Sequence, residues 1–264
     1  MYSPLKQVLK YLNYRLTSSN GKGHGIHSPF VFSFIKDVLN DKTRYPEYKE
    51  IEELRRKLLA DNTPVPLEDY GAGSFAGHGS RSVSTITSLA AKSPKYAALL
   101  FRIVKYYKPH YILELGTSLG ISTAYLAAAD KNSVVVSGEG NFVVASKAKN
   151  NLESLGLYNT RIVTGNFDNT LPEMVAAIPR VDLAFIDGNH REKPTVKYFH
   201  ELLSKVSGSS VLIFDDIHWS EEMEAAWKYI KNHESVMLTI DLFFIGLVFV
   251  RPEFKVKQHF AIRF

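Results

Sequence analysis

Apolar side chains follow two different patterns from about residue 108 onward. Short apolar or β-branched runs alternate with segments in which apolar positions recur every three or four residues. The first pattern is typical of buried strands and the second of amphipathic helices, so their alternation predicts a parallel sheet wrapped by helices. The predicted strands are Tyr111–Leu115, Ser133–Ser137, Arg161–Thr164, Val181–Asp187 and Ser210–Asp215.

Two further strand-like runs near the end of the chain break this alternation. Val236–Asp241 and Leu247–Val250 are separated by too few residues for a crossover helix, so they must pair antiparallel. The sequence therefore predicts an α/β fold with a mostly parallel seven-stranded sheet and an antiparallel C-terminal hairpin. The hairpin separates the chain from dinucleotide-binding dehydrogenases, whose sheets stay parallel through the sixth strand.

Two of the predicted helices carry recognisable end signals. One has apolar residues at helical spacing as far as Val206, and we expect Gly208 to be its C-cap. The other follows Ser220, a predicted N-cap, with Glu221 and Glu222 in its first turn. Both helices follow predicted strands, as the alternating pattern requires.

Residues 1–107 have a different pattern, with helical segments on either side of a stretch rich in Gly, Ser and Pro. The helical segments are Ile51–Ala60 and Tyr96–Tyr107, and the stretch between them runs from Thr63 to Ser80. We expect residues 1–94 to form a helical cap with a lid loop and residues 95–264 to form the main domain. Long loops are often lids or disordered segments, and the sequence leaves both open. As a lid, the loop would have these flexible points: Gly71, Gly73, Gly77 and Gly79.

Composition restricts the class of protein. With 45% hydrophobic and 22% charged residues, the chain is typical of globular proteins and not of disordered or fibrous ones. The absence of cysteine excludes disulfides, zinc–thiolate sites and thiol catalysis, and it fits a reducing compartment. The longest apolar stretch, Leu238 to Val250, contains Asp241 and is too short to cross a bilayer. We therefore expect a soluble, cytoplasmic protein with no membrane partner.

The positive charge is concentrated at the ends of the chain. The formal net charge is +5, and residues 1–30 carry Lys6, Lys10, Arg15 and Lys22 with no acid. A basic end can bind nucleic acid, but so modest an excess is more often a solvated surface. We accordingly expect no nucleic-acid partner.

The segment Tyr111–Ser122 runs from a predicted buried strand into a helix through a turn that contains Gly116 and Gly120. Such a turn lets the backbone approach a ligand closely, and the helix presents free N–H groups. A pyrophosphate site would have the spacing G-x-G-x-x-G, whereas this turn has G-x-x-x-G. Glu114 lies beside the turn, and its carboxylate disfavours a phosphate and suits a cation. The turn therefore predicts a cofactor site for a ligand other than a dinucleotide.

Acidic and polar residues follow the next two predicted strands. Glu139 comes about twenty residues after the turn, where an acid can accept hydrogen bonds from both hydroxyls of a ribose. After the third strand, Asn166 and Asp168 offer acceptors for an adenine amine, and Phe167 offers an aromatic face. Ordinary turn chemistry is the alternative for Asn166 and Asp168.

A second glycine loop, Asp69–Ser74, competes with the first as a cofactor loop. The preceding segment, Thr63–Glu68, contains two prolines, so it cannot form a central strand. No helical pattern follows immediately either. We therefore favour the loop that contains Gly116.

A third group of acids lies at the ends of the fourth and fifth predicted strands. Asp187 ends one strand, and Asp215 and Asp216 end the next. Carboxyl ends of parallel strands line the same crevice, and carboxylates that converge there need a proton or a cation between them. Oxygen ligands favour magnesium or calcium. In the alternative interpretation, Asp187 only positions the cofactor, and Asp215, Asp216 and His218 cap the following helix.

Several of these motifs occur together in one family. They are the Glu-x-Gly loop, the acid Glu139, the segments Phe185–His190 and Phe214–Asp216, and the closing hairpin. In this combination the chain resembles class I S-adenosylmethionine-dependent methyltransferases, which have a Rossmann-like fold. Ser93–Tyr96 and Ile112–Gly116 are similar to segments of the catechol and caffeoyl-coenzyme A O-methyltransferase group. The resemblance covers roughly residues 90 to 250, so it does not extend to most of the N-terminal cap.

The resemblance implies S-adenosylmethionine as cofactor and a set of residues that bind it. These are Glu114, Gly116, Thr117, Ser118, Gly120, Ser122, Glu139, Gly140, Asn166, Phe167, Asp168 and Asp187. Metal-dependent members hold a divalent ion such as Mg²⁺ at the ends of strands four and five, which implies Asp187, Asp215 and Asp216 here. The chain has Asp-Asp where the catechol type has Asp-Asn, which leaves the identity of the metal open.

The resemblance also implies catalytic roles for His190 and Asp187. His190 lies where the catechol group has its general-base lysine and where sugar O-methyltransferases have a histidine. The ion would bind an acceptor hydroxyl and lower its pKa, and His190 would take the proton. We thus expect O-methylation of a small hydroxylated molecule. The alternatives are a methyltransferase-fold protein that binds or modifies RNA and, less favoured, an aminopropyl-transferring relative. A homodimer is compatible with the methyltransferase and with its alternatives.

Overall fold

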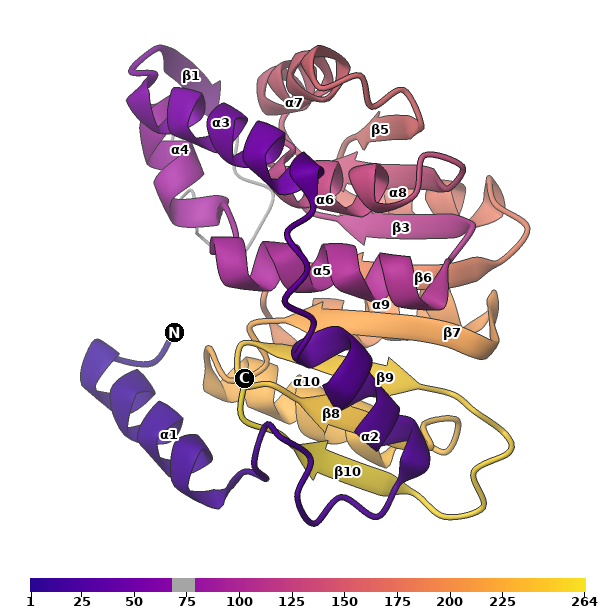
Figure 1. Cartoon of the computed structure of the whole chain (residues 1–264). Helices are drawn as coiled ribbons and strands as arrows, with labels where there is room; N and C mark the ends of the chain where they lie inside the picture. Colours follow the sequence, from indigo (N-terminus) through magenta and orange to yellow (C-terminus); the bar gives the residue numbers. More distant parts are fainter. Residues whose placement is uncertain (68–78) are drawn as a thin grey trace. The chain divides into compact units, whose positions relative to one another are not determined.

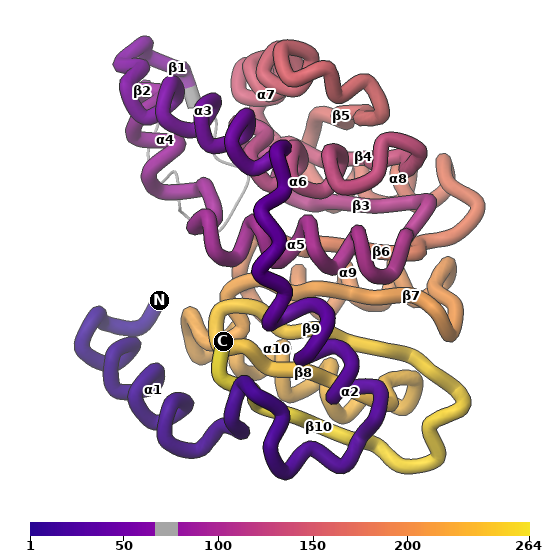
Figure 2. Tube along the Cα trace, viewed as in Figure 1, coloured from indigo at the N-terminus to yellow at the C-terminus, as the bar shows by residue number. Residues whose placement is uncertain are grey.

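The structure is a computed structural model that describes residues 1–67 and 79–264 (Figure 1). The chain divides into two compact units. Unit 2 is the continuous segment Lys42–Ile178, whereas unit 1 combines Met1–Asp41 with Pro179–Phe264. Both ends of the chain, indigo and yellow in Figure 2, therefore belong to unit 1. This division assigns the expected N-terminal cap, residues 1–94, to two different units.

The core of unit 2 consists of three strand–helix repeats. The strands β3 (Tyr111–Leu115), β4 (Val134–Glu139) and β5 (Thr160–Thr164) are parallel and adjacent in this order, and they precede α6 (Ile121–Ala129), α7 (Phe142–Ser154) and α8 (Phe167–Ala176). Every residue of α6 is buried, because this helix is apolar on all sides. The three repeats place the turns after β3, β4 and β5 at the carboxyl ends of neighbouring strands.

The remainder of unit 2 precedes these repeats in the sequence. Its elements are α3 (Pro46–Ala60), β1 (Pro64–Leu67), β2 (Gly79–Ser82), α4 (Val83–Ala90) and α5 (Pro94–Tyr107). The Tyr125 hydroxyl of α6 donates a 2.9 Å hydrogen bond to Glu52 of α3, and Glu52 also binds Arg55. Helix α3 is therefore tied to the helix that follows the predicted cofactor turn.

The stretch expected to be a loop without secondary structure, Thr63 to Ser80, proves to have paired ends. Strands β1 and β2 form a separate two-stranded antiparallel sheet. The two prolines of β1 are compatible with this edge position, where an N–H group is not needed on both sides. The competing glycine loop and Gly71, Gly73 and Gly77 lie outside the described residues, and the lid stays a prediction.

Unit 1 contains five strands in the order β10-β8-β9-β7-β6. They are β6 (Val181–Ile186), β7 (Val206–Asp215), β8 (Leu238–Asp241), β9 (Ile245–Phe249) and β10 (Gln258–Ala261). Strands β6 and β7 are parallel, whereas β9 is antiparallel to both β7 and β8. The predicted closing hairpin is therefore present. Strand β10, which pairs parallel with β8, is an addition to the seven predicted strands.

The helices of unit 1 include α9 (Glu192–Leu203) and α10 (Glu221–Asn232). Ser220 is the N-cap of α10, as predicted, and its side chain accepts a hydrogen bond from the Met223 N–H. The expected C-cap at Gly208 is wrong, because α9 ends at Leu203 and Gly208 lies within β7. Val206 fits both the helical and the strand pattern, and pairing with Val181 places it in the strand.

The N-terminal segment of unit 1 forms α1 (Pro4–Thr17), α2 (Pro29–Phe34) and a short π-helix, η1 (Ile35–Leu39). It meets the C-terminal strands through a parallel bridge between Ser19 and Ile262. The chain thus has the predicted Rossmann-like fold, with a mostly parallel sheet and an antiparallel C-terminal hairpin. Among the helices of the described residues, none is both long and apolar enough to cross a membrane.

Candidate active site

The turn between β3 and α6 has the backbone geometry that its glycines suggest. Gly116 and Gly120 have φ values of +101° and +87°, in the region that favours glycine. Ser118, between them, also has a positive φ of +47°, which is an unusual and strained conformation for a residue with a Cβ atom. The Gly116 and Thr117 N–H groups donate to the Gly138 carbonyl oxygen at 2.9 and 3.0 Å. These bonds hold the turn against the end of β4.

Glu139, at the end of β4, is bound to the same turn. One carboxylate oxygen accepts a hydrogen bond from the Ser118 N–H at 2.8 Å, and the other accepts one from the Asn141 N–H at 2.9 Å. Burial raises the pKa of Glu139, and the backbone hydrogen bonds oppose this effect. The structure therefore places the predicted ribose-binding acid directly beside the predicted cofactor turn.

Glu114, the other acid of this region, lies in the protein interior. It has no solvent exposure. Its carboxylate accepts hydrogen bonds from the Thr123 hydroxyl and, at 2.6 Å, from the Ser137 hydroxyl. The Thr117 hydroxyl in turn contacts that of Ser137. This network ties β3, β4, the turn and α6 together, which is a supporting role that the sequence did not reveal.

A small, partly open pocket lies at the predicted cofactor turn. Residues from Gly116 to Ser122 line one side of it, and the C-terminal end of α4 lines the other through Thr87, Ala90 and Ala91. Sequence reasoning missed the residues of α4, because Val83–Ala90 is rich in Ser and Thr and has no strong helical signal. Thr117 and Ser122 are buried at this site.

The predicted adenine-binding residues follow β5. The Asn166 side chain caps α8 by accepting a hydrogen bond from the Asp168 N–H at 2.9 Å, and Asp168 itself is exposed. The Phe167 ring lies close to Gly138, where an added Cβ atom would approach it to 3.2 Å. Asn166 is thus engaged in helix capping, while Phe167 lies beside the end of β4.

Unit 1 brings together three potential metal ligands. Asp187 after β6, Asp215 at the end of β7, and His190 offer ligand atoms that all lie within 4.8 Å of one another. The His190 Nε2 atom is 3.4 Å from an Asp187 carboxylate oxygen, and Asp215 is only 1% exposed. Two carboxylates and an imidazole are a suitable donor set for a divalent cation.

Asp216 is not part of this group. It has a positive φ of +53°, and its N–H donates to the Phe244 carbonyl oxygen at 2.6 Å. Asn189 and His190 also have positive φ values, of +68° and +40°. The Asn189 amide donates to the Tyr198 hydroxyl at 3.1 Å, which helps to hold this turn. Strained residues therefore occur on both loops that carry the potential ligands, as is common at active sites.

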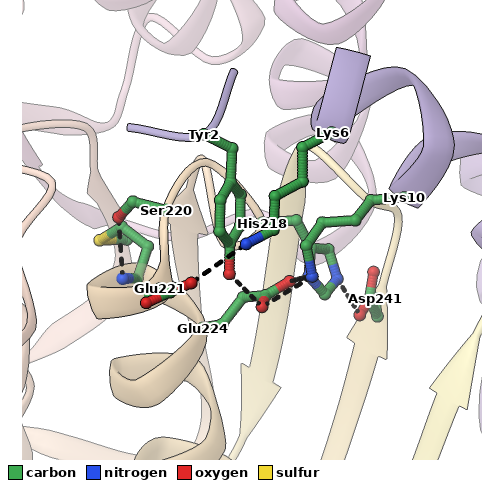
Figure 3. Close-up of polar contacts among 9 residues, drawn as sticks. Tyr2, Lys6, Lys10, His218, Ser220, Glu221, Glu224 and Asp241 are labelled. Carbon is green, nitrogen blue, oxygen red and sulfur yellow. Dashed lines mark hydrogen bonds and ion pairs between the residues drawn. The ribbon is translucent and has the colours of Figure 1, made fainter. Parts of the chain in front are cut away.

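His218 lies on the loop that follows Asp215, but both of its ring nitrogens are already engaged. Nδ1 contacts Glu224 at 3.0 Å, and Nε2 contacts Asp241 at 2.8 Å (Figure 3). Burial alone would lower the pKa of His218, but hydrogen bonds and charge from Asp241 and Glu224 outweigh it and raise the pKa. His218 therefore connects this loop to α10 and β8.

The chain also matches a known family over the segment that contains most of these residues. Residues 113–217 match the family described as the methyltransferase domain. No curated protein sequence matches the chain. The segment runs from β3 to the loop after β7, so it includes the cofactor turn, Glu139 and the Asp187–His190–Asp215 group.

Solved structures share the fold over most of the chain. One is an O-methyltransferase from Bacillus cereus in complex with S-adenosylhomocysteine (SAH), with 20% identity, a TM-score of 0.57, and coverage of 83% of this chain and 97% of its own. A second is the O-methyltransferase TomG from Streptomyces achromogenes, involved in tomaymycin synthesis and bound to S-adenosylmethionine, with 17% identity, a TM-score of 0.55, and coverage of 79% and 91%. A third is a candidate caffeoyl-coenzyme A O-methyltransferase from Staphylococcus aureus, with 20% identity, a TM-score of 0.51, and coverage of 58% and 82%.

These findings define the class of protein. The resemblance to class I S-adenosylmethionine-dependent methyltransferases, and the prediction of such an enzyme, are confirmed by the domain match and the fold together. At these sequence identities, the solved structures show a common fold. The neighbours from Bacillus cereus and Streptomyces achromogenes hold SAH and S-adenosylmethionine, respectively. For this chain, the cofactor site, the acceptor and any metal have to be argued from the residues.

Proposed function

We propose that this protein is an O-methyltransferase that acts on a small hydroxylated molecule with the help of a divalent cation. The observation that carries the proposal is the group formed by Asp187, His190 and Asp215. The O-methyltransferase activity of the structural relatives supports it. Within the described part of the chain, no observation favours the alternative of an RNA-binding or RNA-modifying protein.

In unit 2, the proposal assigns the cofactor to the turn after β3. S-adenosylmethionine supplies the methyl group when bound. Glu139 would accept hydrogen bonds from the ribose hydroxyls, as its place beside Ser118 allows. Gly116 would let the backbone approach the ligand, because a side chain is absent there. Glu114 would act from the interior by holding Thr123 and Ser137 in place.

In unit 1, the proposal assigns the cation to Asp187 and Asp215. A divalent cation supplies Lewis acidity, which lowers the pKa of a hydroxyl that it binds. His190 would accept the proton of the acceptor hydroxyl, and Asp187, 3.4 Å away, would orient the imidazole. His190 also belongs to the group of potential ligands, so the base and ligand roles of this residue have to be separated by experiment.

The test combines a metal-dependent activity assay with a binding assay. Hydroxylated metabolites are screened for methyl transfer with Mg²⁺ and after treatment with a chelator. We expect the chelator, Asp215→Asn and Asp187→Asn to abolish transfer, and His190→Ala to lower it by about 100-fold or more. Asp215→Asn should still bind SAH by calorimetry, because the proposal assigns the ribose contact to Glu139 and not to Asp215.

Asp182→Asn provides the matched control. Asp182 lies on β6, the strand that leads to Asp187, but its carboxylate forms an ion pair with Arg180. This variant should keep its activity. Full activity of the chelator-treated enzyme would refute the requirement for a divalent cation. Unchanged activity of His190→Ala would refute the role of His190 as general base.

A further inference from the structure

Helix α1 is attached to unit 1 by one of its faces only. Lys10 binds Glu224 at 2.8 Å, and Lys6 binds Glu221 at 3.0 Å. The hydroxyl of Tyr2, just before the helix, donates to Glu224 at 2.8 Å. Figure 3 shows these three side chains pointing toward α10. Tyr14 is buried farther along the same helix.

The opposite face of α1 is apolar and exposed. Its large side chains are Leu5, Val8, Leu9, Leu12 and Leu16, with exposures of 70%, 54%, 58%, 52% and 84%. These positions follow the three- and four-residue spacing of a helix, so they form one continuous stripe along α1. We call these five residues the leucine stripe. Single exposed leucines are common, but a contiguous stripe on one helix indicates an interaction surface.

The charge of the segment around α1 is unusually one-sided. Residues 1–36 contain five Lys and Arg residues and no acid, and the first acid is Asp37. The whole chain has 32 Lys and Arg residues against 27 Asp and Glu, so the rest of the chain has 27 of each sign. The entire formal excess of positive charge therefore lies in the segment that also carries the leucine stripe. Arg15 and Lys22 are exposed there.

We propose that α1 docks on the surface of a membrane that contains anionic phospholipids. A helix that combines a polar, basic side with an apolar stripe inserts the stripe at the boundary between headgroups and acyl chains. Basic side chains next to it gain attraction from the negative lipid surface. The hydrogen bonds of Tyr2, Lys6 and Lys10 keep α1 attached to unit 1 and direct the stripe outward.

The same charges disfavour a second copy of α1 as the occupant. Lys6 and Lys10 are balanced by Glu221 and Glu224, but two copies paired through their leucine stripes would each bring Arg15 to the contact, and α1 contains no acid to balance it. The expectation of no membrane partner considered only segments that could cross a bilayer, whereas a helix of this kind lies along the surface. The proposal is independent of the methyl acceptor.

Cosedimentation of the full chain with vesicles tests this proposal. Vesicles of phosphatidylcholine with phosphatidylglycerol are compared with vesicles of phosphatidylcholine alone. We expect binding to the anionic vesicles that weakens as salt is raised and is weak without the anionic lipid. The double variant Leu9→Ser/Leu12→Ser should lose about tenfold or more of the affinity. Arg15→Gln/Lys22→Gln should lower it on anionic vesicles only.

Matched variants separate these effects from general changes of the surface. Leu59→Ser replaces a leucine of α3 that is 44% exposed, and Lys255→Gln replaces an exposed lysine near the other end of the chain. Both should bind like the wild type. No wild-type binding to anionic vesicles, or undiminished binding by the double leucine variant, would overturn the proposal. A third outcome would also overturn it: wild-type protein that does not bind vesicles but forms a dimer in solution, which the double leucine variant converts to monomers.

Discussion

At the scale of single residues, Glu139 is the acid whose environment most directly predicts a ligand contact. Its carboxylate is held by the N–H groups of Ser118 and Asn141 beside the cofactor turn. The sequence indicated this residue through its distance from the turn. The sequence could not show that Glu114 supports the turn from the interior, because this role depends on hydroxyl partners in α6 and β4.

Replacing Glu139 should weaken cofactor binding specifically. Glu139→Gln keeps the size of the side chain but removes the charge, and hydrogen bonds to charged groups contribute about 1.5–3 kcal/mol. We expect the affinity for SAH to fall by roughly 10- to 100-fold in calorimetry. Glu153→Gln, on the exposed side of α7, is the control and should bind normally. Unchanged affinity of the Glu139 variant would contradict the assignment.

His218 should make stability depend on pH. Because Asp241 and Glu224 raise its pKa in the folded chain, protonated His218 stabilises the fold. This contribution is fully present below the unfolded pKa of about 6.5 and is lost as pH rises through the folded pKa. In urea unfolding, wild type should exceed His218→Gln in stability more at pH 6 than at pH 9. In an Asp241→Asn background this difference should shrink, and a difference that grows with pH would refute the argument.

At the scale of elements, the sequence predicted strands best where apolar runs are long. The range Tyr111–Leu115 is the observed β3, and the closing hairpin appears as β8 and β9. Strand β10 was missed, because Gln258–Ala261 is short and only half-apolar, and it exists by pairing with β8. The sheet of β1 and β2 was also missed, because the composition of that stretch, rich in Gly, Ser and Pro, predicts a loop.

Strand β9 has a packing requirement that single-sequence patterns do not reveal. A Cβ atom on Gly246 would lie 2.6 Å from the ring of Trp227, which is 2% exposed on α10. Gly246→Ala should therefore destabilise the fold by about 1–3 kcal/mol in urea unfolding, because a buried indole has little room to move. Gly79→Ala, with no atom of the described residues within 4 Å of the added Cβ, should stay within about 0.5 kcal/mol of wild type. Equal stabilities would show that Trp227 repacks without cost.

At the scale of the whole molecule, the sequence predicted the class of fold but not the division into units. Residues 1–41 associate with residues 179–264, so a boundary at residue 94 does not coincide with either unit. The contacts responsible join residues more than 200 positions apart, such as Lys10 and Glu224. No local pattern encodes such a pairing.

A ligand that binds only the folded chain should raise its thermal stability. SAH at about 100 times its dissociation constant should add about 2.7 kcal/mol, which corresponds to roughly 5–10 °C in the melting temperature of a chain of this size. In Glu139→Gln at the same SAH concentration the gain should shrink to about 0.4–1.4 kcal/mol, roughly 1–6 °C, because the affinity is 10- to 100-fold lower. In Asp215→Asn the full shift should persist. A wild-type melting temperature that does not change when SAH is added would contradict cofactor binding.

The discontinuity of unit 1 has a consequence for how the chain is made. Its first segment leaves the ribosome long before residues 179–264 exist, roughly 10–45 s earlier at ordinary rates of translation. Unit 2 is continuous and can finish folding during that interval. Helix α1 has to wait, with its leucine stripe and its unmatched lysines, until Glu221 and Glu224 are synthesised. The nascent chain therefore folds from its middle outward, and its first helix is among the last parts to find its place.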